Sequence, residues 1–67
     1  MITIQFNGQE KSLPVGTSIE QLLLDSGVPV KFCAVELNLE IVPKDAYWNR
    51  LLQEGDAMEV VTLVGGG

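Results

Sequence analysis

The chain has 67 residues, 46% of them hydrophobic, and nine acidic against four basic side chains give a net charge of −5. This length predicts a single domain, and the acidic balance argues against nucleic acids and anionic membranes as partners. Cys33 has no second cysteine to pair with, histidine is absent, and no apolar run approaches the ~20 residues of a membrane span. We therefore expect a fold held by packing alone in a reducing, cytoplasmic compartment, with no signal peptide, bound cofactor or metal site.

The first thirteen residues predict a β-hairpin. Apolar residues alternate with polar ones over residues 2–6, which is the period of a half-buried strand. Asn7-Gly8 is favoured in type I′ turns because both central positions of that turn need positive φ. A two-residue loop places Phe6 opposite Gln9 and makes residues 9–13 the second strand. The polar composition of this second strand is typical of a sheet edge.

Residues 18–26 carry the signals of a short helix. Thr17 and Glu20 fit a capping box, in which each side chain accepts a hydrogen bond from the other residue's backbone N–H. Gly27 stands where a left-handed residue commonly ends a helix. Apolar residues recur at the i, i+3 and i+4 positions that define one helix face, namely Ile19, Leu22 and Leu23.

The remainder predicts three more strands and one irregular segment. Residues 32–37 form a strand with Cys33, Val35 and Leu37 on one face, and residues 40–42 form a shorter one that ends at Pro43. Residues 44–52 have helix-like spacing, so we expect a short helical or 3₁₀ turn there, with Trp48 covering one end of the core. After a turn at residues 54–56, residues 57–64 are apolar on both faces, as in a central strand.

This order predicts an α+β fold, in which a mixed sheet of four or five strands packs on one main helix. If the last strand runs beside and parallel to the first, the arrangement is the ubiquitin-like β-grasp. We expect the β-grasp domain to span residues 1–64 and residues 65–67 to form a flexible glycine tail.

The tail is the most unusual feature of the chain, which ends Leu63-Val64-Gly65-Gly66-Gly67. Glycine has no side chain, so this backbone can enter a slot too narrow for a Cβ. The reactive group of the tail is the Gly67 α-carboxylate, which is ionised at neutral pH. In an extended conformation residues 64–67 would reach about 13–14 Å beyond the strand. Such a tail is typical of a substrate for a partner enzyme, although a frayed glycine end is the alternative.

The chain resembles the sulfur carrier proteins of thiamin biosynthesis, small β-grasp proteins that end in Gly-Gly. The resemblance covers nearly the whole chain, and residues 35–43 followed by Trp48 are its most specific part. Residues 44–53 match more loosely. The matching elements are the opening strand with Asn7-Gly8, the leucine helix at residues 19–24, the segment at residues 34–43, the segment at residues 55–61 and the terminal residues 64–67.

The resemblance implies a mechanism for the tail. An E1-like adenylyltransferase would bind ATP and Mg²⁺ and recognise the tail through Leu63, Val64, Gly65 and Gly66. The Gly67 carboxylate would attack the α-phosphate of ATP and displace pyrophosphate. A persulfide on a partner's cysteine would then displace AMP and leave a C-terminal thiocarboxylate, which donates its sulfur to thiazole synthase. The carrier itself would have no catalytic residues and would not be an enzyme.

Two groups of residues suggest other chemistry, and we assign both to structure or surface. As the one thiol of the chain, Cys33 is a candidate persulfide carrier, but it lies on an apolar strand face, and free cysteine is among the most buried residue types. The acids are assigned to the solvated surface, where Asp56 and Glu59 near the last strand would steer partners with a basic face. These acids are Asp45, Glu54, Asp56 and Glu59.

Two alternatives stay open at this stage. One is a related β-grasp carrier that donates sulfur for molybdopterin, cysteine or tRNA thiolation. The other is an inert ubiquitin-like interaction domain.

Overall fold

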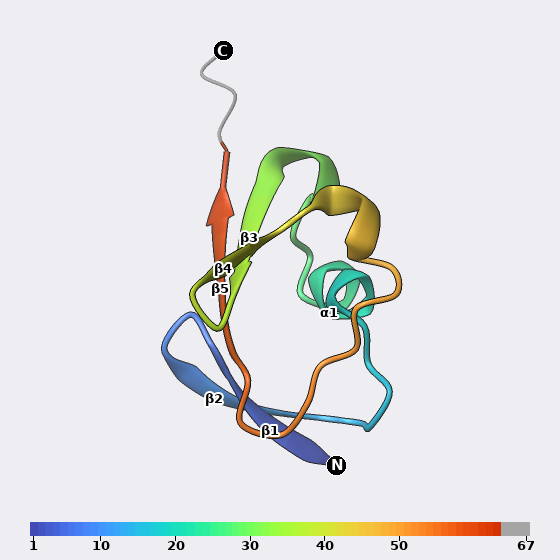
Figure 1. Cartoon of the computed structure of the whole chain (residues 1–67), viewed down its shortest axis with the longest axis vertical. Coiled ribbons are helices and arrows are strands. Elements are labelled where there is room, and N and C mark those ends of the chain that lie inside the picture. The colour runs from blue at the N-terminus through green and yellow to red at the C-terminus, as the bar shows by residue number, and fades with distance from the viewer. Residues whose placement is uncertain (64–67) are drawn as a thin grey trace.

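The computed structural model describes residues 1–63, so Val64 and the predicted tail at residues 65–67 lie outside the described residues. Five strands form one sheet in the order β2-β1-β5-β3-β4, with β5 at the centre (Figure 1). The elements are β1 Ile2–Phe6, β2 Gln9–Leu13, α1 Ile19–Asp25, the 3₁₀ turn η1 Val30–Phe32, β3 Cys33–Leu37, β4 Glu40–Val42, the 3₁₀ turn η2 Lys44–Ala46 and β5 Ala57–Thr62.

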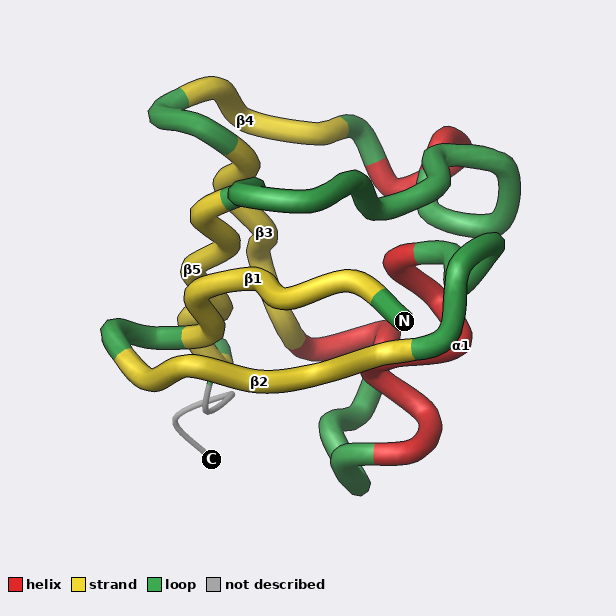
Figure 2. The backbone as a smooth tube through the Cα atoms, turned by 90° about the horizontal axis from the view of Figure 1, so that it is seen from below, coloured by secondary structure: helices red, strands yellow, loops and turns green. Residues whose placement is uncertain are grey.

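The helix α1 covers one face of the sheet, which confirms the predicted two-layer α+β arrangement (Figure 2). The sheet is mixed, because β5 runs parallel to β1 and antiparallel to β3. None of the helices within residues 1–63 is long and apolar enough to cross a membrane. The core between the two layers consists of Ile4, Leu13, Ile19, Leu22, Leu23, Cys33, Val35, Leu37, Val42, Tyr47, Leu52 and Met58.

The predicted hairpin is confirmed, including its register. Phe6 pairs with Gln9, and Asn7 and Gly8 both have positive φ, at 50° and 80°. Asn7 also fastens the hairpin to the central strand. Its backbone N–H donates to the Met58 carbonyl oxygen at 2.9 Å, and its Oδ1 accepts from the Val60 N–H at 2.7 Å. The turn therefore has both a local and a tertiary role.

The helix is present, but the predicted capping box is wrong. The N-cap is Ser18, whose Oγ accepts from the Gln21 N–H at 3.1 Å, and the helix runs from Ile19 to Asp25. Thr17 instead belongs to the preceding turn, where its Oγ1 donates to the Pro14 carbonyl oxygen at 2.7 Å. Gly27 has φ of +75° and ends the helix in the left-handed conformation, as predicted.

The strand β3 begins one residue later than predicted. Phe32 belongs to η1, where its N–H donates to the Pro29 carbonyl oxygen at 3.0 Å. The face assignment is confirmed, because every second residue of β3 is buried, namely Cys33, Val35 and Leu37. Phe32 itself is exposed at the start of β3.

The 3₁₀ turn predicted after Pro43 is confirmed as η2, but the assignment of Trp48 to the core is wrong. Trp48 is 65% exposed, whereas its neighbour Tyr47 is 1% exposed. The Tyr47 carbonyl oxygen accepts from the Glu20 N–H at 3.0 Å, which holds this residue against the start of α1. Successive side chains of a helical turn point about 100° apart, so burying Tyr47 turns Trp48 outward.

The last strand is central and lies parallel to β1, as predicted, with Phe6 opposite Met58. It ends at Thr62, before the expected boundary at residue 64, which is outside the described residues. Its two faces have different environments. Met58 is buried in the core, whereas Val61 on the open face is 61% exposed. The open face of β5 is therefore apolar without being covered by the rest of residues 1–63.

Candidate functional site

Leu63 is the one predicted site residue that the structure describes. It follows β5 directly. Its N–H donates to the carbonyl oxygen of Phe32, the residue before β3, so the antiparallel pairing of β5 with β3 extends one residue further, to Leu63. The Leu63 side chain is 50% exposed. The central strand thus places an accessible apolar residue two positions before the predicted glycine tail. The predictions for Val64, Gly65, Gly66 and Gly67 lie outside the described residues.

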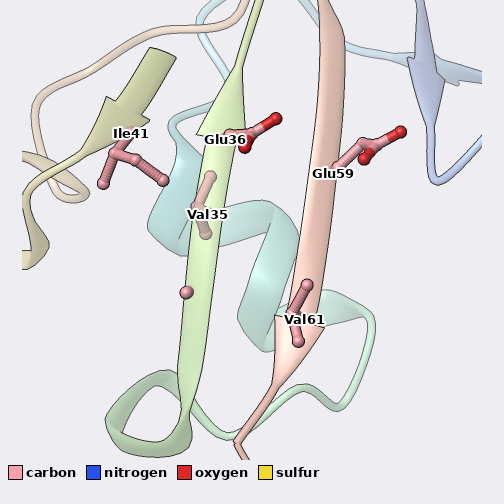
Figure 3. Close-up of a pocket in the computed structure, with 6 residues that line it drawn as sticks. Val35, Glu36, Ile41, Glu59 and Val61 are labelled. Carbon is pink, nitrogen blue, oxygen red and sulfur yellow. The ribbon is translucent and has the colours of Figure 1, made fainter. Parts of the chain in front are cut away.

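A shallow hollow of about 60 Å³ lies on the open face of the sheet, beside the C-terminal half of β5 (Figure 3). Its apolar part combines β5 and β3, where Val61 and Ala34 are register partners, with Ile41 of β4. The complete lining is Ala34, Val35, Glu36, Ile41, Glu59 and Val61. The hollow therefore offers a small apolar surface, and one of its lining residues, Val61, is two positions before Leu63.

Two carboxylates border this hollow. Glu36 and Glu59 are register partners across β3 and β5, and their side chains point the same way in Figure 3. Like charges directly opposite each other in a sheet repel and destabilise the pairing. The pair concentrates negative charge beside an apolar surface. Glu59 was predicted from the sequence as a steering residue, whereas Glu36 and Ile41 were not, because their proximity depends on the register between β3, β4 and β5.

The other acids have different environments from Glu59. Asp45 and Glu54 are exposed, as predicted, and Glu54 Oε1 also accepts from the Thr3 N–H at 3.0 Å. Asp56 accepts from Asn38 Nδ2 at 3.0 Å and from the Gln53 N–H at 2.8 Å, so its carboxylate holds a turn together. It precedes β5 and lies at the opposite end of that strand from Leu63. Within residues 1–63, no group of three His, Cys, Asp or Glu residues could hold a metal ion.

Cys33 is a core residue, as predicted. Its exposed fraction is 0%, and its Sγ donates a weak hydrogen bond to the Val30 carbonyl oxygen at 3.6 Å. Burial raises the pKa of the Cys33 thiol, and the nearby Lys44 charge opposes this only in part. The pKa of the Tyr47 phenol is raised too, first by burial and then by Cys33. A thiol kept protonated and out of solvent is poorly suited to carry a persulfide.

Replacing Cys33 with Ala is expected to lower the free energy of unfolding by about 1 kcal/mol near pH 7 through lost packing. The folded-state pKa of the thiol is raised, so its stabilising contribution is complete below the unfolded pKa of about 8.5 and is lost as pH rises through the folded value. The difference between wild type and Cys33→Ala should therefore shrink above about pH 8.5. Urea unfolding at pH 7 and at pH 9.5 measures it.

The same variant also separates a structural from a chemical role. We expect folded Cys33→Ala to accept sulfur at the C-terminus as wild type does. A folded variant that accepts none would contradict the core assignment of this residue.

Comparison with known proteins identifies the family. The chain matches the ThiS family over residues 4–67. Proteins named thiazole synthase from Paramagnetospirillum magneticum and Magnetococcus marinus are 43% and 39% identical to it over 61 and 64 residues. These matches cover 91% and 96% of this chain but 19% and 20% of the two synthases. The chain thus spans about a fifth of their length.

Two further relatives have the size of this chain. The sulfur carrier protein ThiS of Bacillus subtilis is 35% identical over 65 residues, covering 96% of this chain and 98% of that protein. The crystal structure of the thiamine biosynthesis protein ThiS from Geobacter metallireducens superposes with a TM-score of 0.84 at 26% identity, covering 98% of this chain and 100% of that one. This likeness confirms the predicted ubiquitin-like β-grasp. Proteins of this kind are in general carriers and not catalysts, and the chain belongs to the ThiS family, the sulfur carriers of thiamin biosynthesis.

Proposed function

We propose that this chain carries sulfur on the carboxyl group of Gly67 and delivers it for the assembly of the thiamin thiazole. The observation that supports this most directly is the position of Leu63. Leu63 directly follows the central strand β5 and is held there by the hydrogen bond from its N–H to the Phe32 carbonyl oxygen. It is followed in the sequence by Val64 and three glycines. A tail that begins at a fixed, exposed point can be threaded into a partner's active site while the globular part stays outside.

The proposed chemistry proceeds in an E1-like adenylyltransferase that binds ATP and Mg²⁺. A Gly67 carboxylate oxygen attacks the α-phosphorus, the bond to the β-phosphate breaks, and pyrophosphate leaves. The terminal sulfur of a cysteine persulfide on a partner then attacks the acyl carbon and AMP leaves, which gives an acyl disulfide. A thiol reduces this disulfide, releasing the Gly67 thiocarboxylate and a new disulfide on the donor side. Glycine leaves no side chain to shield or attack the activated carbonyl.

The sulfur acceptor is proposed to be thiazole synthase. This assignment is supported by the two relatives named thiazole synthase, each of which contains a region similar to almost the whole of this chain. Sulfur carriers for molybdopterin, cysteine or tRNA thiolation share the same activation chemistry and differ in the acceptor. The acceptor therefore has to be identified by transfer.

The direct test is the intact mass of the chain after incubation with ATP, Mg²⁺, the E1-like enzyme and a persulfide donor. We expect a mass increase equal to the replacement of one oxygen by sulfur, which requires ATP and is lost when thiazole synthase and its other substrates are added. An unchanged mass would favour an inert interaction domain. A thiocarboxylate that thiazole synthase leaves intact, but that another acceptor consumes, would favour a different sulfur pathway.

The hollow on the open face is the proposed docking surface for these partners. Both partners must reach Gly67, so they should use overlapping surface around the end of β5. The apolar residues Val61 and Leu63 would supply most of the binding energy there. Glu36 and Glu59 would steer a basic partner face, since exposed charges affect association more than affinity. Asp56 is too far along β5, and too engaged in its turn, to have this role.

We expect Glu59→Lys to slow association with the E1-like enzyme by roughly threefold to tenfold at low salt, because it removes part of the steering charge. Leu63→Ala should mainly speed dissociation, by about tenfold. Stopped-flow or surface-based kinetics at two salt concentrations measure both rates. The controls are Asp25→Lys, which makes the same charge change on α1, and Leu24→Ala, which truncates another exposed leucine, on that helix. Association that ignores both salt and Glu59→Lys would contradict the steering role.

A further inference from the structure

In the C-terminal part of the central strand β5, some backbone N–H and C=O groups point away from β3. The Leu63 N–H donates to the Phe32 carbonyl oxygen, and the Asn38 N–H donates to the Ala57 carbonyl oxygen. In an antiparallel pair, residues that exchange such bonds alternate with residues whose N–H and C=O point to the opposite side. The residues of β5 whose backbone N–H and C=O groups point away from β3 are therefore Met58, Val60 and Thr62.

The strand β1 covers only the first part of this edge. Its pairing with β5 ends at Phe6 and Met58, where the Asn7 N–H donates to the Met58 carbonyl oxygen. Asn7 Oδ1 then accepts from the Val60 N–H at 2.7 Å. Beyond that point, residues 1–63 provide no strand beside the Val60 carbonyl, the Thr62 N–H and the Thr62 carbonyl. Figure 1 shows the tip of β5 extending past the β1–β2 hairpin.

This edge differs from the two outer edges of the sheet. The strand β2 is exposed at four of its five positions and carries Lys11, which discourages pairing with another chain. The strand β4 has three residues and is followed by Pro43. The free part of β5, in contrast, presents Val60 and Thr62, whose β-branched side chains favour extended pairing. It also lies immediately before the residues that a partner must bind.

We propose that the E1-like enzyme, when it binds the tail, adds an extended backbone segment of its own as a new strand against this edge of β5, from Val60 to Thr62. This inference rests on the proposed function and specifies how the E1-like enzyme binds the chain. The added strand would accept from the Thr62 N–H and donate to the Thr62 and Val60 carbonyl oxygens. Such strand addition supplies affinity through main-chain hydrogen bonds.

Asn7 fixes where this pairing begins. Its side chain already satisfies the Val60 N–H, so the first donor for an added strand that residues 1–63 leave unpaired is at Thr62, and the strand extends from there towards the C-terminus. Pairing in that direction would set the register and direction of the residues that follow Leu63. The apolar hollow on the open face and the edge of β5 would then hold the same partner from two adjoining sides.

Replacing Thr62 with Pro tests the proposal, because it removes the N–H that the added strand would bind and leaves the pairing with β3 intact. Proline is tolerated at strand edges whose N–H faces solvent, so the urea midpoint should stay near that of wild type. We expect binding to the E1-like enzyme, measured without ATP, to weaken by about tenfold or more. Thr62→Val keeps the N–H and the branched shape and should bind as wild type does.

Amide hydrogen exchange in the wild-type chain gives a second, mutation-free readout. The Thr62 N–H should exchange quickly in the free chain and at least about tenfold more slowly in the complex. Wild-type affinity of a folded Thr62→Pro, or a Thr62 amide that stays unprotected in the complex, would overturn the added strand. Either result leaves the proposed function standing if the wild-type chain still gains sulfur. Conversely, a wild-type chain that binds the enzyme but gains no sulfur would refute the function and not the strand pairing.

Discussion

Deletion of Gly67 is expected to abolish adenylation while leaving the free energy of unfolding nearly unchanged. The deletion removes the proposed reacting carboxylate and moves the new terminus one residue, about 3.3–3.6 Å, short of its position in the active site. Misplacement of a reacting group by even 1 Å can lower a rate by about 10². The buried core, in contrast, extends only from Ile4 to Met58. ATP–pyrophosphate exchange and urea unfolding measure the two effects.

Substitution at Gly66 distinguishes the shape of the tail from its length. Gly66→Trp keeps the terminal carboxylate but adds a side chain that a slot shaped for glycine cannot admit, so we expect exchange to be lost again. Gly66→Ala, with a single Cβ, should fall between Gly66→Trp and wild type. Exchange at the wild-type rate in the Gly67 deletion or in Gly66→Trp would contradict the proposed role of the tail.

Features of the fold that depend on local chemistry were predictable from the sequence. Asn7-Gly8 specifies a turn type and thereby the register of β1 with β2, because a two-residue loop leaves no freedom to slip. The alternation over Cys33, Val35 and Leu37 likewise identifies the buried face of β3. These predictions succeeded because the relevant contacts lie within a few residues of each other.

Several predictions that depended on contacts between distant segments were wrong or incomplete, although the parallel pairing of β5 with β1 was predicted correctly. Thr17 and Ser18 are adjacent hydroxyl residues, and either fits an N-cap by composition. The choice is made by the segment that follows η2, since the Leu52 N–H donates to the Thr17 carbonyl oxygen at 2.9 Å and holds Thr17 outside the helix. The open-face hollow was missed for the same reason. Glu36 and Glu59 are 23 positions apart, and only the register of β3 with β5 brings them together.

The pair Tyr47 and Trp48 shows the same difficulty and leads to a large expected effect. Both are aromatic residues in an irregular segment, and the larger one was the natural candidate for the core. In the structure Tyr47 packs in the core. Trp48 lies largely in solvent. Size alone does not decide burial here, because the contact between Tyr47 and the start of α1 fixes which side chain points inward.

We therefore expect Tyr47→Ala to lower the free energy of unfolding by about 3–5 kcal/mol, and Trp48→Ala to change it by no more than about 0.5 kcal/mol. A domain of this size has a total stability of only about 3–10 kcal/mol, so Tyr47→Ala is expected to be substantially unfolded. Tyr47→Phe keeps the buried ring and removes only the hydroxyl, so it should remain folded and lose at most about 1–2 kcal/mol. Urea unfolding followed by far-UV circular dichroism compares all three variants without relying on the fluorescence of Trp48. Equal losses for Tyr47→Ala and Trp48→Ala, or a larger loss for Trp48→Ala, would contradict the core assignment.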